Sequence, residues 1–387
     1  MPCKIISFSY ISSSLNFSVI MNWLRYSIFA IVGCILIFIL LYLQHPLFWK
    51  RPSWERLKRI KQSPHYKYFQ FKNLSKTPLM TYSKISPRRN SWLNLIKKAK
   101  EGVRPPIIPH VKTDLHKLEK NLNAIIWLWH SAFFMQLDWK TFLVDPTLVT
   151  WSPIPFVNKA FPWADTYKPK DMPYIDYLLI THDHYDHLDY FTIKELRWKI
   201  GKVVCWLWIG AHFERWWFKN ENIIELDWEQ EFKEWKLKLT VLPARHFSWR
   251  LLRPNNTLRC SFMIESPSST IYLAGDWGYD TFYREIWKKW DIDIAIVENW
   301  QYSKSWKYIH TLPQQLPQTI KELWAKRVIP AHNGKYALST HLWKEPLEIL
   351  SKEAEEYHFN LLTPQIWEVV NINNKKQVFT KWRENVD

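Results

Sequence analysis

The feature that most constrains this chain is a short segment crowded with side chains that bind metal ions. Residues Thr181–Asp189 read Thr-His-Asp-His-Tyr-Asp-His-Leu-Asp. They follow the apolar run Tyr177–Ile180, which we expect to be a buried strand, and they precede a helical stretch that Asp189 can cap. Three imidazoles and several carboxylates this close together would repel one another or lack partners if they were simply buried. Neutral histidine and carboxylate are ligands that zinc accepts, so the segment predicts a metal site on a strand-to-helix loop at the carboxyl end of a sheet.

Beyond about residue 121, short apolar runs alternate with helical patterns, which is typical of an α/β domain. We expect strands at Ala124–Trp129, Phe133–Leu137, Phe142–Val144, Tyr177–Ile180, Leu237–Leu242, Ser261–Ile264, Thr270–Leu273 and Ile292–Val297, and helices at Phe191–Lys199, Ala211–Phe218 and Gln314–Ala325. The four cysteines lie far apart and match no disulfide, metal or redox spacing; they are Cys3, Cys34, Cys205 and Cys260.

The spacing His-x-His-x-Asp-His after a strand resembles the signature of the metallo-β-lactamase superfamily. The rest of the chain, from about Pro52 to Glu348, is similar to one branch of it, which holds N-acylphosphatidylethanolamine-hydrolysing phospholipase D and bacterial ascorbate-phosphate-lactonase-like proteins. The motifs that carry the likeness are Trp129–Ser131, Leu143–Pro146, the histidine loop, Pro243–His246, Gly275–Tyr279, Ile309–His310 and Pro330–His332. The resemblance implies an α/β fold, an αββα sandwich with a dinuclear metal site at its edge.

The resemblance also implies a set of metal ligands, position by position. It assigns His182, His184 and His246 to the first metal, and Asp186, His187 and His332 to the second, with Asp276 bridging both. The strand pattern agrees with this assignment, because Asp276 and His332 each come just after an apolar run. The expected cofactors are two divalent metal ions, with zinc favoured, although iron and manganese also accept such sites.

Two metals about 3.5–4 Å apart can hold a hydroxide between them and clamp the oxygens of a displacement. Hydrolysis of a phosphodiester or another ester is the chemistry that such a site supports. In the phospholipase branch, the histidine that matches His310 faces the substrate, so we expect Asp186, Asp276 and His310 to be catalytic. Asp145 is a candidate to orient a ligand histidine. We expect His130 and His212 to fix loops by hydrogen bonds.

An uncharged apolar run from Tyr26 to Leu43 predicts a membrane anchor, because it is long enough to span a bilayer and offers no small-residue cleavage site. The basic residues that follow it place the catalytic domain in the cytoplasm by the positive-inside rule. The predicted organisation is an N-terminal tail (1–22), of which 1–20 are untranslated if Met21 is the start, then an anchor (23–45), a basic connecting arm (46–120) and the hydrolase domain (121–387).

The formal net charge of +17 favours an anionic partner, and with the anchor it indicates an anionic phospholipid or a phosphorylated small molecule at the membrane. The leading hypothesis is a phospholipase D-type phosphodiesterase. A lactonase or other small-ester hydrolase is the alternative, and a non-enzymatic binding module is a weaker one. No nucleic acid partner is expected, because the interval from Asp276 to His332 is too short for the large domain that nucleases of this superfamily insert there.

The composition is unusual, with 7 Gly and 26 Trp among 387 residues, whereas ordinary proteins contain about 7% Gly. Asp138-Trp139 occupies a two-residue hairpin turn for which Asp-Gly is the usual sequence. We therefore hypothesise that UGA codons translated as Trp are read as Gly in the source organism; an unusually aromatic protein is the alternative. The family pattern carries Gly at Trp129, Trp139, Trp208, Trp217, Trp249 and Trp300, and Trp at Trp216, Trp228, Trp306 and Trp343. An indole at Trp277, beside the bridging Asp276, is expected to crowd the metals.

Overall fold

The computed structural model describes residues 9–81, 102–149, 160–250 and 254–386. The chain divides into two compact units, Met1–Phe48 and Trp49–Asp387. The first eight residues of the predicted tail and residues 82–101 of the predicted arm lie outside the described part of the chain.

The first unit consists mainly of helix α1, Ser9–Tyr42. Its segment Phe17–Tyr42 is long and apolar enough to cross a membrane, with a hydropathy of 2.5 and none of its most apolar window buried against protein. Length and composition alone are equally compatible with a signal sequence. The helix begins well before Tyr26, where the apolar run starts.

The second unit holds a seven-stranded sheet in the order β15-β3-β4-β5-β6-β7-β8. Its strands are β3 (Ala124–Trp127), β4 (Phe133–Leu137), β5 (Lys140–Val144), β6 (Ile175–Leu179), β7 (Ile200–Trp206), β8 (Ile223–Leu226) and β15 (Val369–Asn371). The strands from β15 to β5 pair antiparallel, and those from β5 to β8 pair parallel. The carboxyl ends of β5, β6 and β7 therefore meet at one edge.

A six-stranded sheet in the order β14-β13-β12-β11-β10-β9 faces the first. Its strands are β9 (Glu231–Glu234), β10 (Leu237–Pro243), β11 (Cys260–Glu265), β12 (Thr270–Leu273), β13 (Ile294–Glu298) and β14 (Val328–Ala331). Strands β12, β13 and β14 run parallel. The sheets touch near their ends, where the amide of Cys260 donates a 3.1 Å hydrogen bond to the carbonyl of Thr181.

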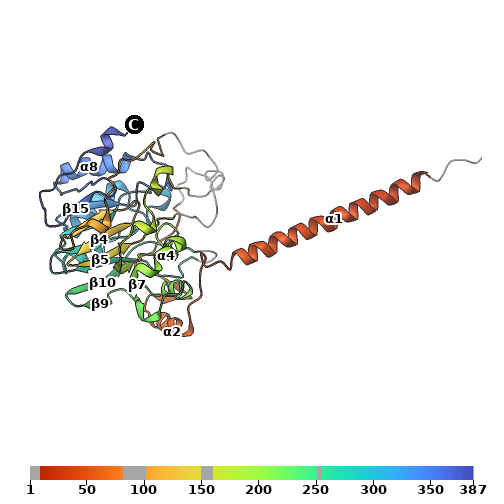
Figure 1. Cartoon of the computed structure of the whole chain (residues 1–387), viewed down its shortest axis with the longest axis horizontal. Coiled ribbons are helices and arrows are strands. Elements are labelled where there is room, and N and C mark those ends of the chain that lie inside the picture. The colour runs from red at the N-terminus through yellow and green to blue at the C-terminus, as the bar shows by residue number, and fades with distance from the viewer. Residues whose placement is uncertain (1–8, 82–101, 150–159, 251–253, 387) are drawn as a thin grey trace, which may run out of the picture. The chain divides into compact units, whose positions relative to one another are not determined.

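Helices cover the outer faces of the two sheets, and the layers can be followed in Figure 1. They are α2 (Trp54–Gln62), α4 (Tyr190–Leu196), α5 (Gly210–Arg215), α6 (Tyr283–Trp287), α7 (Leu316–Leu323) and α8 (Glu345–Tyr357). A buried cluster joins β10–β14 to Ile286 of α6, Leu316 of α7 and Leu350 of α8. The fold is an αββα sandwich, as the sequence predicted.

Smaller elements complete the chain. The hairpin strands β1 (Tyr66–Lys67) and β2 (Gln70–Phe71) pair with each other. Short 3-10 helices lie at Leu115–Lys117, Pro162–Asp165, Pro169–Asp171, Arg197–Lys199, Asn220–Asn222, Lys304–Trp306, Pro313–Gln315 and Trp382–Asn385.

The basic segment that contains α2 is tied to the catalytic body by buried charges. The guanidinium of Arg56 pairs with the carboxylates of Glu225 and, at 2.9 Å, Glu214. Glu225 also accepts 2.9 Å hydrogen bonds from the amides of Trp208 and Gly210. Because Arg56 and Glu225 are almost wholly buried, each needs the other to remain charged.

Candidate metal centre

The histidine loop leaves the carboxyl end of β6 and enters α4 directly. Asp189 caps α4, as predicted, by accepting hydrogen bonds from the amides of Phe191 (3.2 Å) and Thr192 (3.1 Å). Its second oxygen is held by the hydroxyl of Thr192 at 2.5 Å. The loop is therefore held by β6 at its start and by the cap of α4 at its end, so its side chains project beyond the carboxyl end of the sheet.

The structure brings the seven predicted ligands together in two adjoining groups. The first consists of His182, His184, His246 and Asp276, whose ligand atoms all lie within 4.8 Å of one another. Nδ1 of His184 lies 3.0 Å from Nε2 of His182 and 3.3 Å from Nε2 of His246. His246 follows β10 and Asp276 follows β12, so three separate chain segments meet here.

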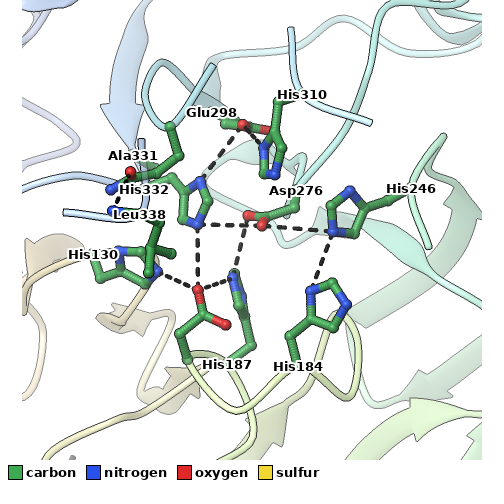
Figure 2. Close-up of polar contacts among 12 residues, drawn as sticks. His130, His184, His187, His246, Asp276, Glu298, His310, Ala331, His332 and Leu338 are labelled. Carbon is green, nitrogen blue, oxygen red and sulfur yellow. Dashed lines mark hydrogen bonds and ion pairs between the residues drawn. The ribbon is translucent and has the colours of Figure 1, made fainter. Parts of the chain in front are cut away.

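The second group consists of Asp186, His187 and His332, together with His130. Nε2 of His332 lies 3.6 Å from Oδ2 of Asp186, and Nε2 of His187 lies 3.8 Å from the same oxygen. His332 comes directly after β14. Figure 2 shows His187, His246 and His332 around Asp276, with dashed lines that mark their contacts to it.

Asp276 lies between the two groups. Its Oδ1 is 3.3 Å from Nε2 of His187, and its Oδ2 is 3.2 Å from Nε2 of His332. The same Oδ2 is 3.8 Å from Nε2 of His246. Oδ2 thus lies between His332 of the second group and His246 of the first, so Asp276 is placed where a carboxylate shared by two metal ions would be.

The donor atoms fit two metal ions. Ligands held about 2.0–2.1 Å from an ion at the corners of a tetrahedron lie about 3.4 Å from one another, close to the separations in both groups. Among the described residues, Nε2 of His187, Nε2 of His332 and Oδ1 of Asp276 are buried without a hydrogen-bond partner. Three converging orphaned polar atoms would be costly in a protein that binds no cation here.

Side chains behind the ligands orient the rings. Asp145 accepts from Nδ1 of His187 at 2.8 Å and from the backbone amide of Thr181 at 2.8 Å, as expected of a residue that fixes a ligand histidine. Nδ1 of His246 donates to the carbonyl of Ile309 at 2.6 Å. In both rings these bonds leave Nε2 to face the centre.

Glu298 is a candidate site residue that was not predicted from the sequence. It ends β13, is wholly buried and accepts a 2.7 Å hydrogen bond from the amide of Trp277. Its Oε1 also bonds Nδ1 of His310 and lies 3.5 Å from Nδ1 of His332. One carboxylate thus contacts two site histidines. The signal available in the sequence was its place at the end of an apolar run beside two other such strand ends.

His310 lies in the centre, as the resemblance implied. It groups with Asp276 and His332, and its ring stacks on that of His332 with centroids 5.4 Å apart. Its side chain is 13% exposed, and that of Asp186 is 21% exposed. His184 is also partly exposed, so these three residues mark the open side of the site.

The expectation for His130 was incomplete. Its backbone does fix loops, through an amide bond of 2.7 Å to the carbonyl of Asn333. Its buried ring, however, lies in the metal centre, where Nε2 is 2.9 Å from Oδ2 of Asp186. The motif Trp-His-Ser gave no hint of this, because the contact depends on the turn after β3 lying beside the loop between β6 and α4.

Two other expectations were wrong. His212 was expected to fix a loop by hydrogen bonds, but within the described chain neither of its ring nitrogens has a partner, and the ring packs near Trp216. Trp277 was expected to crowd the metals. Its indole instead packs in the buried cluster, with its ring centroid 4.1 Å from that of Tyr283.

The electrostatics differ between the two groups. Burial lowers the pKa of His184 to about 3 and holds the pKa values of His182 and His246 well below 6.5, which keeps these imidazoles in the neutral form that binds metal. For His332, burial lowers the pKa, but the nearby carboxylates of Asp276, Asp186 and Glu298 outweigh it and raise the pKa to about 10. The carboxylates therefore favour positive charge in the second group.

The comparison with known families agrees with this geometry. The family described as "Beta-lactamase superfamily domain" matches residues 140–333, a span that contains all seven predicted ligands and His310. The chain belongs to the β-lactamase superfamily. It is a metal-dependent hydrolase of the metallo-β-lactamase fold, and its His/Asp clusters are the metal-binding part of that fold.

Relatives in this superfamily cover most of the chain. An uncharacterised protein of Mycobacterium tuberculosis is 27% identical over 83% of this chain and 88% of its own length. The N-acyl-phosphatidylethanolamine-hydrolyzing phospholipase D 1 of Caenorhabditis elegans is 27% identical over 70% of this chain and 80% of its own length.

A solved structure supports the fold. A possible metal-dependent hydrolase from Veillonella parvula aligns with a TM-score of 0.51 at 14% identity, over 65% of this chain and 99% of that one. The alignment shows that the two chains share a fold over this part.

Proposed function

We propose that this chain is a membrane-anchored phosphodiesterase of phospholipase D type that hydrolyses an anionic phospholipid. The observation that carries the proposal is the convergence of two ligand groups on Asp276 with His310 beside them. The likeness to a phospholipase D that hydrolyses N-acyl-phosphatidylethanolamine supports it.

We propose His182, His184, His246 and Asp276 as ligands of one metal, and Asp186, His187, His332 and Asp276 as ligands of the other. Zinc is the metal that this set of imidazoles and carboxylates suits best. When bound, two such ions would lower the pKa of a water molecule and stabilise negative charge that develops on the phosphate. Asp276 would hold the two ions at a fixed separation.

His310 is the proposed contact to the substrate. Glu298 holds its Nδ1, which leaves Nε2 to donate a hydrogen bond to a phosphoryl oxygen or to the leaving oxygen. Hydrolysis would add water across the bond between phosphorus and the headgroup oxygen, and would release phosphatidic acid and the headgroup alcohol. Asp186 and His184, which are partly exposed, would lie at the entrance.

The first unit supplies the proposed location. Helix α1 would span the membrane, and the exposed basic residues that follow it would lie at the cytoplasmic surface; they are Lys50, Arg51, Lys58, Arg59 and Lys61. Basic side chains near an anionic leaflet gain about 1 kcal/mol each. The catalytic unit would therefore face a substrate that stays in the inner leaflet.

The proposal is tested with the full chain, in the presence of zinc, on vesicles that contain N-acylphosphatidylethanolamine. A parallel reaction offers the same chain a soluble phosphorylated lactone. We expect release of phosphatidic acid that disappears in His246→Ala and persists in His116→Ala, which alters an exposed histidine outside the site. Hydrolysis of the lactone without phosphatidic acid would overturn the proposal in favour of a lactonase. Equal release by His246→Ala would overturn it altogether.

A further inference from the structure

The tryptophan surplus has a conformational counterpart in the structure. Among the described residues, seventeen that are not glycine have positive φ, and seven of these are tryptophan: Trp129, Trp139, Trp208, Trp217, Trp235, Trp324 and Trp367. Tryptophan supplies only 26 of the 387 residues, so it is strongly over-represented in this class. Positive φ is uncommon outside glycine, and for a bulky residue it is a genuine outlier.

The other residues with positive φ include types that tolerate this conformation. Several are Asn, Asp or His, which tolerate the left-handed region better than other side chains do. Among the seven glycines of the chain, Gly102, Gly275 and Gly334 have positive φ. The tryptophans therefore share a backbone preference with the glycines rather than with the other large residues.

Two hairpin turns show the pattern most clearly. Leu137 pairs with Lys140 across the turn Asp138-Trp139, whose φ values are 45° and 71°. Positive φ at both central residues defines a type I′ turn, for which Asp-Gly is a preferred pair. The indole of Trp139 is 66% exposed, so its packing contributes little that would offset the strained backbone.

The second hairpin joins β9 to β10. Glu234 pairs with Leu237 across Trp235-Lys236, and Trp235 has a φ of 56° and is 92% exposed. Only a residue without a Cβ adopts this conformation at little cost.

Helix α7 ends on the same feature. Its C-cap is Trp324, in the left-handed conformation, with an amide that bonds the carbonyl of Ile320 at 3.1 Å. Glycine is the usual residue at a left-handed helix end. Trp324 is 67% exposed, so the indole makes no compensating core contact.

Other tryptophans look like native ones. The indole N–H groups of Trp127, Trp228, Trp306 and Trp382 donate to backbone carbonyls at 2.8–3.1 Å, and none of these residues has positive φ. By contrast, Trp129 and Trp367 combine positive φ with a buried indole N–H that has no partner among the described residues. Trp208 is the exception, since its φ is 88° and its indole bonds the carbonyl of Lys50.

We propose that the seven tryptophans with positive φ stand at positions that are glycine in the protein made by the cell, because UGA codons there are read as glycine. The proposal is independent of the function proposed above. One of the seven, Trp129, lies next to the metal centre. Its φ is 105°, and it immediately precedes His130, whose ring contacts Asp186.

Peptide mass spectrometry of the protein isolated from its source organism tests the assignment directly. The peptide that spans Asp138–Lys140 should have the mass of Asp-Gly-Lys, and the peptide that spans Trp228, whose indole donates a hydrogen bond and whose φ is not positive, should have the mass expected for tryptophan. Glycine at Trp139 and Trp235 supports the proposal. Tryptophan at either of those two positions overturns it.

A second test uses two full-length chains from recoded genes, one with tryptophan and one with glycine at the four positions whose indoles are exposed, Trp139, Trp217, Trp235 and Trp324. We expect the glycine chain to unfold at a higher denaturant concentration, because the strained turns relax. Trp228→Gly is the matched control and should unfold at a lower concentration, because it removes a buried indole and its hydrogen bond to Arg259. If the four glycines lower the unfolding midpoint as the control does, the proposal is wrong.

Discussion

Oδ2 of Asp145 lies 2.8 Å from Nδ1 of His187, although the two residues are 42 positions apart in the chain. Asp145 follows β5 and His187 follows β6, which are parallel neighbours in the seven-stranded sheet. The contact fixes which nitrogen of His187 carries its proton and turns Nε2 toward Asp186 and Asp276. A carboxylate behind a ligand imidazole also makes the imidazole a stronger base.

Removing the Asp145 carboxylate should therefore weaken metal binding. We expect Asp145→Asn to lower the affinity of the second metal about 10-fold, and Asp145→Ala up to about 100-fold, as measured by competition with a chelator of known affinity. Asp176→Asn alters a carboxylate that bonds Thr141 and Lys140 outside the site and should leave the affinity unchanged. Equal affinities in all four proteins would contradict the role given to Asp145.

Glu298 should affect the reaction through His310. In Glu298→Gln the bond to Nδ1 of His310 loses its charge, so we expect turnover to fall about 10- to 100-fold while the first metal group keeps its ion. Glu322→Gln is the control, because Glu322 is a buried carboxylate that bonds Tyr279 and Arg284 instead. Steady-state kinetics with metal analysis of the same samples would show the split. Normal turnover in Glu298→Gln would contradict a role for Glu298 in the reaction.

The buried pair between Arg56 and Glu225 predicts a stability effect. Arg56→Met leaves the Glu225 carboxylate buried without its cation, which should lower the free energy of unfolding by about 3–5 kcal/mol. Lys58→Met removes the same charge from the exposed side of α2 and should change it by about 0.5 kcal/mol or less. Urea unfolding of both variants is the measurement, and equal midpoints would refute the prediction.

Glu353 on α8 should make stability depend on pH. Burial and the charge of Glu356 raise its pKa from 4.5 to about 7, and one of its oxygens is buried without a partner among the described residues. The folded state therefore binds a proton more tightly than the unfolded state, so this group lowers the free energy of unfolding as pH rises from 4.5 to 7.

Glu353→Gln removes that penalty. We expect the variant to exceed the parent chain in stability at pH 8, by about 1 kcal/mol or less after solvent screening, and to match it at pH 4. Unfolding curves at the two pH values measure the difference, with Glu355→Gln at an exposed neighbouring position as control. A difference that is the same at both pH values would show that Glu353 does not titrate in this window.

The sequence contained most of the candidate site because its residues follow strands that are apolar runs. Strands β4 and β12 have the predicted bounds, and the histidine loop joins a strand to a helix, β6 to α4, as predicted. Glu298 and His130 were missed because their roles depend on which strands are neighbours. Strand order is set by packing between sheets, and no local pattern encodes it.

The bounds of helices were less accurate, and the cause lies in particular residues. Helix α5 ends at Arg215 instead of Phe218, because Trp217 has a φ of 65° and cannot continue a right-handed helix. Helix α4 ends at Leu196 and continues as a 3-10 turn through Lys199. Strand β9, with the sequence Glu-Phe-Lys-Glu and an exposed edge, carries too little apolar signal to predict alone.

Metal analysis of the purified full chain tests the central claim most directly. We predict two bound divalent ions per chain, and loss of bound metal in both His246→Ala and His332→Ala. His358→Ala, which alters an exposed histidine, should keep both ions. A parent chain that binds a single ion, or His246→Ala and His332→Ala variants that keep both, would contradict a dinuclear centre held by these residues.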